Sequence, residues 1–422
     1  MTRNSLEPFE RLESNVRSYS RCFPAVFTTA SGAEVMDEGG QKRIDFFCGA
    51  GSMNYGHNPP ALTEAVIAYL KSGGLLHGLD TATVPKRELL EAFEATILRP
   101  RKMNHRVQFT SPAGTDAVEA SLKLARKVTG RVPVVAFTGA YHGVSTGALA
   151  AMGSRKHRAA AGMPLHNIHR VPYPEGPSGS FDTLGYLKMM LDDHMSGFDL
   201  PAAVLIECVQ MEGGVYAASS EFLRGLRQLC TEKGIFLIAD EIQVGCGRTG
   251  PFFSYEPSGI IPDIVTLSKS IGSGFPMAMC LIREDLDKWG PGEHCGTFRG
   301  HQLSFIAARA TLEYWKDDKL QRGTAASAEL VKSWHAERRN KPAWPGLRGL
   351  GLGLGLDFAT AGGGARSEAI AAKAFDLGVI AETCGRNDEV LKLMPPLTIP
   401  ADVLRRGLDV IEAAIAAVPV TG

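Results

Sequence analysis

The chain has 422 residues, of which 44% are hydrophobic and 21% are charged, the composition of an ordinary globular protein. Its 45 lysines and arginines balance its 45 aspartates and glutamates, and this zero net charge argues against a nucleic-acid partner or an anionic membrane surface. At this length two packed lobes are expected rather than a single core.

The N-terminal segment, MTRNSLEPFERLESNVRSYSR, is polar and charged and lacks the apolar core of a signal peptide. No later stretch has the roughly eighteen uninterrupted apolar residues that a membrane span needs. The eight cysteines include no Cys-x-x-Cys pair and no zinc spacing, so we expect them to be reduced. The pattern predicts a cytoplasmic protein with no membrane segment and no metal site.

The first predicted element is a small hairpin around the Glu-Gly-Gly turn of GAEVMDEGGQKRIDFF, residues 32–47. From about residue 105 to 285, apolar runs rich in Val, Ile and Leu alternate with helical patterns. Such runs predict strands covered on both faces, and the intervening helices predict right-handed parallel crossovers. This region is therefore expected to be the core of an α/β domain.

After about residue 318 the pattern changes to a charged helix at 328–341, a glycine-rich run at 347–358 and a closing helix at 400–418. The glycine-rich run, LRGLGLGLGLDF, lacks the βαβ frame of a dinucleotide site and is expected to be a close-packed strand. We expect residues 61–317 to form a large domain, and residues 1–60 and 318–422 to form one smaller α+β domain.

Lys269 stands where the buried strand of IVTLSKSIGSGFP is expected to end. A single lysine after a strand is ordinarily solvated, so only partners from elsewhere in the chain can give it a special role. IFLIADEIQVG places Asp240 and Glu241 at another strand end. A buried carboxylate requires a cation, which a protonated pyridine nitrogen could supply, although the motif alone also suits a metal site or a helix cap.

Gly114 and Thr115 precede an amphipathic helix, where free backbone N–H groups form a ready cradle for phosphate, or where Thr115 serves as a plain N-cap. Tyr141 and His142 follow a further strand in a glycine-flanked loop, where an aromatic face can stack on a planar ring. An amine, an acid, an anion cradle and an aromatic plate along one sheet edge together suit pyridoxal 5'-phosphate.

The motifs LIADEIQVGCGRTG and TLSKSIGSGFPM resemble those of the class III (ω-amino) aminotransferases, and further matching segments run in family order along nearly the whole chain. Within that class, RLESNVRSYSRCFPAVF, LLHGLD and PGEHCGTFRG are most similar to diaminobutyrate:2-oxoglutarate aminotransferases, which open ectoine synthesis. The resemblance implies the fold type I of pyridoxal-phosphate enzymes, a large domain with a mostly parallel sheet between helices plus a smaller α+β domain.

Residue by residue, the resemblance makes Lys269 the Schiff-base lysine and proton carrier, and Asp240 the partner of the pyridine nitrogen. The other implied cofactor contacts are Gly114 and Thr115 at the phosphate, Tyr141 with His142 above the ring, Ile242 below it, Gln243 at the phenolic oxygen, and Thr297 at the phosphate of a neighbouring subunit. A homodimer with shared active sites, with further assembly left open, is therefore implied.

The resemblance also implies that Glu212 gates the substrate site by pairing with a cation. Lys392 and Val144 stand where many relatives have arginines, so carboxylate recognition is expected to differ in detail. Arg299 is a candidate for a substrate carboxylate or for an inter-subunit contact, with an ordinary interface ion pair as the alternative.

The implied reaction moves the terminal amino group between L-glutamate and L-aspartate 4-semialdehyde, giving L-2,4-diaminobutyrate and 2-oxoglutarate by a ping-pong mechanism. One alternative is another class III aminotransferase or an aminomutase that acts on a different diamine, β-amino acid or amino ketone. A second alternative is a catalytically silent cofactor-binding protein.

Overall fold

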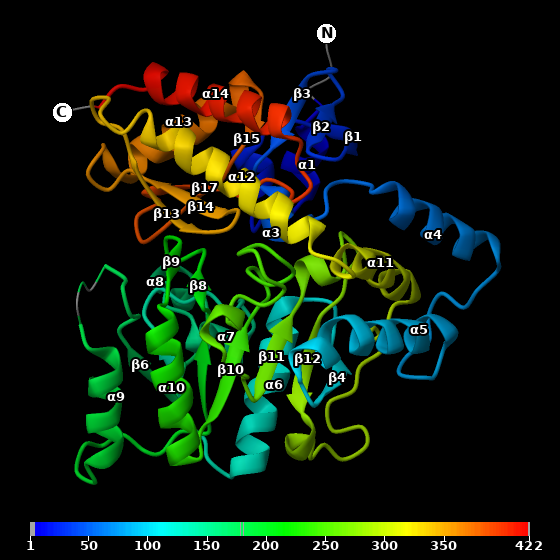
Figure 1. The fold of residues 1–422 in the computed structure, drawn as a ribbon, viewed down its shortest axis with the longest axis vertical. Helices are drawn as coiled ribbons and strands as arrows, with labels where there is room; N and C mark the ends of the chain where they lie inside the picture. Colours follow the sequence, from blue (N-terminus) through cyan, green and yellow to red (C-terminus); the bar gives the residue numbers. More distant parts are fainter. Residues whose placement is uncertain (1–4, 178, 180, 421–422) are drawn as a thin grey trace.

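The computed structural model describes residues 5–177, 179 and 181–420, so the expected domain segments 1–60 and 318–422 extend at their outer ends beyond the described residues. The lower lobe in Figure 1 is built on a seven-stranded sheet with the strand order β4-β12-β11-β10-β7-β5-β6. Its strands are β4 (His105–Phe109), β5 (Val134–Phe137), β6 (Ile168–Val171), β7 (Ala203–Ile206), β10 (Phe236–Asp240), β11 (Ile264–Leu267) and β12 (Met279–Arg283).

Within this sheet, β12 alone runs against the others, and a glycine-rich segment that contains the one-turn helix Lys269–Ile271 joins it to β11. The pairs β10–β11, β10–β7, β7–β5 and β5–β6 are parallel. The expectation of a mostly parallel sheet is confirmed, since β12 is the one strand of this sheet that runs antiparallel to its neighbours.

Both faces of the sheet are covered, which explains why its strands lack polar alternation. In β10 the side chains of Leu237 and Ala239 belong to the core shared with α10 (Ser220–Lys233), whereas Ile238 belongs to the core shared with α6 (Gly114–Thr129). Successive side chains of a strand point to opposite faces, so two separate cores form on one sheet.

The upper lobe in Figure 1 contains both marked chain ends and joins elements from both termini. One sheet has the order β1-β2-β3-β15 and the other β13-β14-β17-β16, and a shared core includes Phe46, Leu356 and Ile411. The strands are β1 (Phe27–Ser31), β2 (Glu34–Asp37), β3 (Lys42–Asp45), β13 (Gly346–Leu350), β14 (Gly353–Asp357), β15 (Val379–Ile380), β16 (Thr383–Cys384) and β17 (Val390–Leu393). The hairpin expected near residue 40 is β2–β3, while the domain boundaries at 60/61 and 317/318 stay a prediction.

Helices complete both lobes, and none within the described part of the chain is both long and apolar enough to cross a bilayer. Those of the upper lobe are α12 (Lys319–Ala336), α13 (Gly363–Leu377) and α14 (Ala401–Ala417). The others are α1 (Glu7–Leu12), α2 (Tyr19–Cys22), α3 (Cys48–Gly51), α4 (Pro60–Lys71), α5 (Val84–Phe93), α7 (Thr146–Ala151), α8 (Arg155–Ala159), α9 (Thr183–Asp192) and α11 (Gln302–Leu312), and a short pair β8 (Val209–Gln210) and β9 (Tyr216–Ala217) lies between the lobes.

The glycine-rich run at 347–358 was expected to be one strand, and this expectation is wrong: β13 and β14 form an antiparallel hairpin. The chain turns at Gly351, which has a φ of +57°. A Cβ at that position would lie 2.5 Å from the backbone of Thr249, so only glycine fits this turn. The sequence gives no sign of this turn, because leucine and glycine alternate in the same way in both strands of the hairpin.

Candidate active site

A cavity of about 220 Å³ lies at the carboxyl edge of the large sheet, where open parallel sheets bind their ligands. Residues from the ends of five strands line it: Gly114 after β4, Tyr141 and His142 after β5, Glu207 after β7, Asp240 at the end of β10 and Lys269 after β11. A second cavity of about 340 Å³ shares Gly114 and Lys269 with the first. The expected gathering of these residues along one edge is thus a property of the structure.

Asp240 is 4% exposed and is held by three donors. Its Oδ2 lies 2.7 Å from His142 Nδ1, and its Oδ1 accepts from Thr266 Oγ1 and from the backbone N–H of Ile242, both at 3.1 Å. Because a carboxylate only accepts, Nδ1 of His142 carries the hydrogen. The Nε2 atom of His142 is buried and has no hydrogen-bond partner among the described residues.

Lys269 is partly buried rather than solvated, which excludes the ordinary interpretation of a lysine after a strand. Its backbone has a φ of +54°, a left-handed conformation that is strained for a residue with a side chain. Its Nζ donates to the carbonyl of Ala50 at 3.0 Å. Burial lowers the pKa of Lys269, although the nearby Glu212 carboxylate opposes the shift. A larger fraction of this amine is therefore neutral than in a solvated lysine.

Helix α6 begins at Gly114 with no side-chain cap, so the alternative interpretation of Thr115 as an N-cap is wrong. The Thr115 hydroxyl instead lies 2.5 Å from the hydroxyl of Ser145. A Cβ at Gly114 would lie 2.9 Å from the side chain of Ile242, so glycine keeps this helix start open. The first backbone N–H groups of a helix lack partners within it and are available to an anion.

Glu207 is a cavity residue that the sequence patterns did not single out. It is 8% exposed, and its Oε2 accepts from the backbone N–H of Tyr141 at 3.0 Å. Burial and the charge of Asp240 hold the pKa of Glu207 well above its usual range. The signal available was an acid directly after the apolar run AAVLI, the same signal that identified Asp240.

Behind Lys269 lies a charged cluster that joins the two lobes. Lys392 is completely buried, and its Nζ lies 2.6 Å from Glu212 Oε1 and 2.7 Å from Glu382 Oε2. Glu212 Oε1 also accepts from Gln243 Nε2 at 2.9 Å, and the same Nε2 donates to Ala50 O at 3.0 Å. Burial opposes the charge on Lys392, but the two carboxylates outweigh it and hold its pKa well above the ordinary value.

Four of the expected site residues line neither cavity: Glu212 and Lys392 of the charged cluster, Thr297 and Arg299. Thr297 lies in an exposed loop, where its carbonyl accepts from His77 Nε2 at 2.7 Å. Arg299 donates through Nη1 to the carbonyl of His294 in the same loop. Val144, in contrast, lines the cavity and is 58% exposed, so an apolar side chain stands where an arginine was considered.

The amino-acid sequence is similar to those of known aminotransferases. Residues 16–415 match the family model described as aminotransferase class-III. A diaminobutyrate–2-oxoglutarate transaminase from Nocardia farcinica is 49% identical over 415 residues, covering 96% of this chain and 93% of that protein. A protein of the same name from Streptomyces anulatus is 48% identical over 417 residues, covering 98% and 99%.

The fold has relatives among solved structures. An amine transaminase from an uncultivated Pseudomonas species, in its PLP-bound form, aligns with a TM-score of 0.86 and 26% identity, covering 99% of this chain and 100% of that one. This likeness confirms the expected type I fold, and the family match confirms the expected class. The chain belongs to the class-III aminotransferase family.

Proposed function

We propose that the cavity binds pyridoxal 5'-phosphate and that the chain transfers amino groups with it. The observation that carries the proposal is that an amine, a carboxylate and an open helix start, from Lys269, Asp240 and Gly114, face one cavity. The residues fit the cofactor, because a Cβ at Gly114 would close the phosphate cradle at 2.9 Å from Ile242. When bound, the cofactor supplies an electron sink at the carbon that carries the amino group.

The residues around the ring have separate tasks. Lys269 Nζ binds the cofactor covalently and carries protons to and from the substrate, tasks that its lowered pKa favours. Asp240 holds a proton on the ring nitrogen through the attraction of opposite charges. Tyr141 and Ile242, which both line the cavity, would contact the two faces of the ring. Gln243 binds the phenolic oxygen after exchanging one of its two present acceptors.

The phosphate end is held by the start of α6 and by the loop that follows β5. Gly114 and Thr115 offer backbone N–H groups, and the Thr115 hydroxyl is oriented by Ser145. His142 supports Asp240 from behind through its 2.7 Å contact. These groups orient the cofactor without taking part in proton transfer.

The substrates we propose are L-glutamate and L-aspartate 4-semialdehyde, which give 2-oxoglutarate and L-2,4-diaminobutyrate in two half-reactions at one site. The shared name of the two relatives supports this pair of substrates. Lys392 is the proposed contact for a substrate carboxylate. Because its ammonium group is fully buried between the carboxylates of Glu212 and Glu382, Glu212 must move aside before a substrate can reach it. Arg299 is the proposed contact for a second carboxylate, supplied within the chain or across a subunit interface.

We further propose a homodimer in which Thr297 reaches the phosphate of the other subunit, with higher assembly left open. The position of Thr297 in an exposed loop, away from the cavity of its own chain, supports this reading. A cytoplasmic location is part of the same proposal. All eight cysteines are unpaired, as in a reducing compartment.

The test is the half-reaction of the purified, cofactor-loaded protein. L-2,4-diaminobutyrate is expected to remove the visible absorbance of the lysine-bound cofactor, and 2-oxoglutarate is expected to restore it. Lys269→Ala should abolish this cycle, whereas Lys288→Ala, at an exposed lysine, should leave it intact. Ordinary turnover by Lys269→Ala would refute the mechanism.

Two alternatives give different outcomes in the same experiment. Absorbance that responds to another diamine, a β-amino acid or an amino ketone, but not to diaminobutyrate, would identify a class III enzyme or aminomutase with a different substrate. Absorbance that responds to no amine, glutamate included, would identify a catalytically silent cofactor-binding protein.

A further inference from the structure

Lys392, Glu212 and Glu382 form a cluster with one positive and two negative groups, in which Lys392 is buried and the two carboxylates are partly buried. Glu382 and Lys392 are neighbours on adjoining antiparallel segments, where the backbone N–H of Lys392 donates to the Glu382 carbonyl at 2.8 Å. With all three groups ionised, the cluster carries one uncompensated negative charge. A buried charge of this kind favours a ligand that brings a cation.

The cluster adjoins the place where a substrate must react. Burial raises the pKa of Tyr141, a cavity residue, and the negative charges of Glu212 and Glu382 raise it further. Both carboxylates also favour the charged form of Lys269. The hydrogen bonds agree: Lys269 Nζ and Gln243 Nε2 donate to the same carbonyl, that of Ala50, and Gln243 Nε2 also donates to Glu212. A molecule that reacts at Lys269 therefore lies close to the cluster.

The two carboxylates are not equivalent. Glu212 Oε1 has two partners, Lys392 and Gln243, whereas Glu382 Oε2 contacts Lys392 but accepts no hydrogen bond of ordinary geometry. The side chain of Glu382 is 18% exposed. Burial and the charge of Glu212 raise the pKa of Glu382, although the Lys392 ammonium opposes the shift. Glu382 is therefore the carboxylate with spare capacity for another donor.

The chemistry of the proposed substrates shows which cation could use that capacity. In both L-glutamate and L-2,4-diaminobutyrate, two carbons separate the reacting carbon from a distal carboxylate. One cation, Lys392, can therefore serve the distal carboxylate of either substrate. The carbon next to that carboxylate bears an ammonium group in diaminobutyrate and only hydrogens in glutamate.

We propose that Glu382 binds this second, untransferred ammonium group and so determines the preference for a diamino acid. The proposal rests on the substrates proposed above. Glu382 takes no part in the glutamate half-reaction, where no such ammonium group exists. Burial raises the pKa of Tyr19, from α2, and the charge of Glu382 raises it further, so the two groups interact.

The test compares three amines in single-turnover half-reactions: L-2,4-diaminobutyrate, 4-aminobutyrate, which lacks only the α-ammonium group, and L-glutamate. In Glu382→Gln, kcat/KM for diaminobutyrate is expected to fall about 10- to 100-fold, the usual range for one charge-assisted hydrogen bond. The values for 4-aminobutyrate and glutamate are expected to stay within about threefold of wild type, because neither offers an ammonium group at that position.

Two further variants keep the test informative. Glu329→Gln removes a carboxylate that also lies 2.7 Å from a lysine, Lys332, but on the surface, and it should change none of the three rates. Glu382→Asp keeps the charge and should retain the preference for diaminobutyrate over 4-aminobutyrate. This second variant decides the question if Glu382→Gln fails to fold.

The outcomes separate this inference from the proposed function. An equal fall with all three amines in Glu382→Gln would mean that Glu382 only supports Lys392, and would overturn the inference. An unchanged preference for diaminobutyrate in that variant would also overturn it while leaving the proposed function standing. Wild-type protein that does not react with diaminobutyrate would refute the proposed substrate and this inference together.

Discussion

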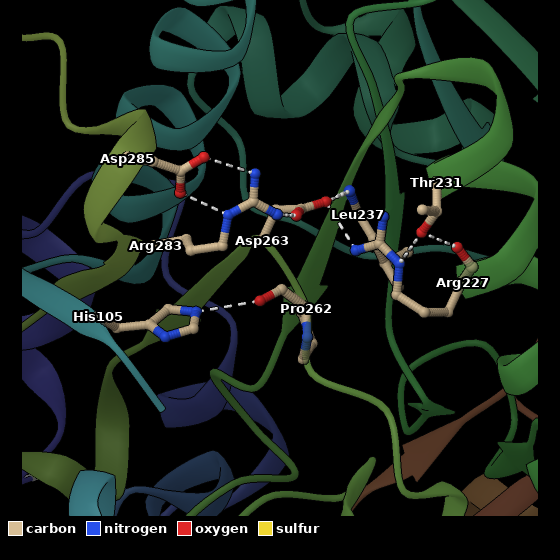
Figure 2. Close-up of polar contacts among 8 residues, drawn as sticks. All are labelled: His105, Arg227, Thr231, Leu237, Pro262, Asp263, Arg283 and Asp285. Carbon is tan, nitrogen blue, oxygen red and sulfur yellow. Dashed lines mark hydrogen bonds and ion pairs between the residues drawn. The ribbon is translucent and has the colours of Figure 1, made fainter. Parts of the chain in front are cut away.

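Removal of the Asp263 carboxylate should destabilise the large lobe without altering the active site. Asp263 directly precedes β11, and its side chain is 2% exposed. Figure 2 shows it between two arginines: Oδ2 accepts from Arg227 Nη1 of α10 and from the backbone N–H of Leu237, both at 2.7 Å, and Oδ1 pairs with Arg283 at the end of β12. One carboxylate thus joins a helix and two strands.

The expected magnitude follows from the exposure of the partners. Asp263→Ala leaves the buried Leu237 N–H without an acceptor, which costs about 1–3 kcal/mol. Breaking a buried ion pair costs about 3–5 kcal/mol when the remaining charge cannot reach water. The side chains of Arg227 and Arg283 are 18% and 40% exposed and can recover some hydration, so we expect a total near 3 kcal/mol, at the lower end.

The assay is thermal unfolding at fixed protein and cofactor concentration. A loss near 3 kcal/mol should lower Tm by about 3 °C in a chain of this size. Asp285→Ala is the control, because Asp285 pairs with the same Arg283 but is 63% exposed, and it should lower Tm by less than about 1 °C. Equal small shifts in both variants would refute the reasoning. The half-reaction at 25 °C should be unchanged, since Asp263 and Lys269 lie at opposite ends of β11.

Three further predictions concern buried polar groups. Arg248, which is 0% exposed, donates to the carbonyls of Leu352 and Pro395 and to the side chain of Asn54. Arg248→Met leaves these three acceptors unpaired and should lower Tm by at least about 3 °C, measured as above; a smaller shift would show that the lobes hold together without it. Burial raises the pKa of Glu241 to about 8, so the folded state holds a proton that the unfolded state releases, and stability should fall as pH rises from about 5 to 8. Glu241→Gln should remove part of that fall, and an identical difference in Tm between pH 5.5 and pH 8 in both proteins would contradict the assignment. Glu207→Leu removes the acceptor for the Tyr141 N–H and should weaken cofactor binding about 10-fold, measured by equilibrium dialysis. Glu207→Gln keeps an acceptor oxygen and should bind the cofactor within about threefold of wild type. Equal cofactor affinities in the two variants would show that the Tyr141 loop does not depend on this hydrogen bond.

Much of the large lobe could be predicted because its signals are local. The runs that became β7, β10 and β11 are apolar except at Asp240 and Thr266, and such continuous runs are typical of strands covered on both faces. The hairpin of residues 346–357 was missed for a matching reason: its two arms have the same alternating composition, and only the packing of Gly351 against Thr249 reveals the turn.

The expected placement of site residues agrees with the structure where a reactive side chain coincides with a strand end. Lys269 and Asp240 each follow an apolar run directly, and the parallel register that sets Asp240 beside Thr266 brings them to one edge. Glu207 carried the same signal and was overlooked. The roles assigned to these residues stay predictions until the half-reactions are measured.

The amino-acid sequence by itself determined which residues could do chemistry and on which kind of element each would lie, because hydrophobic periodicity and turn composition act over a few neighbouring residues. Only the tertiary structure decided which of them meet. Glu212 and Lys392 are 180 residues apart in the chain, yet their side chains lie 2.6 Å from one another. Contacts of this kind depend on strand register and on the packing of two lobes, and no local pattern records either.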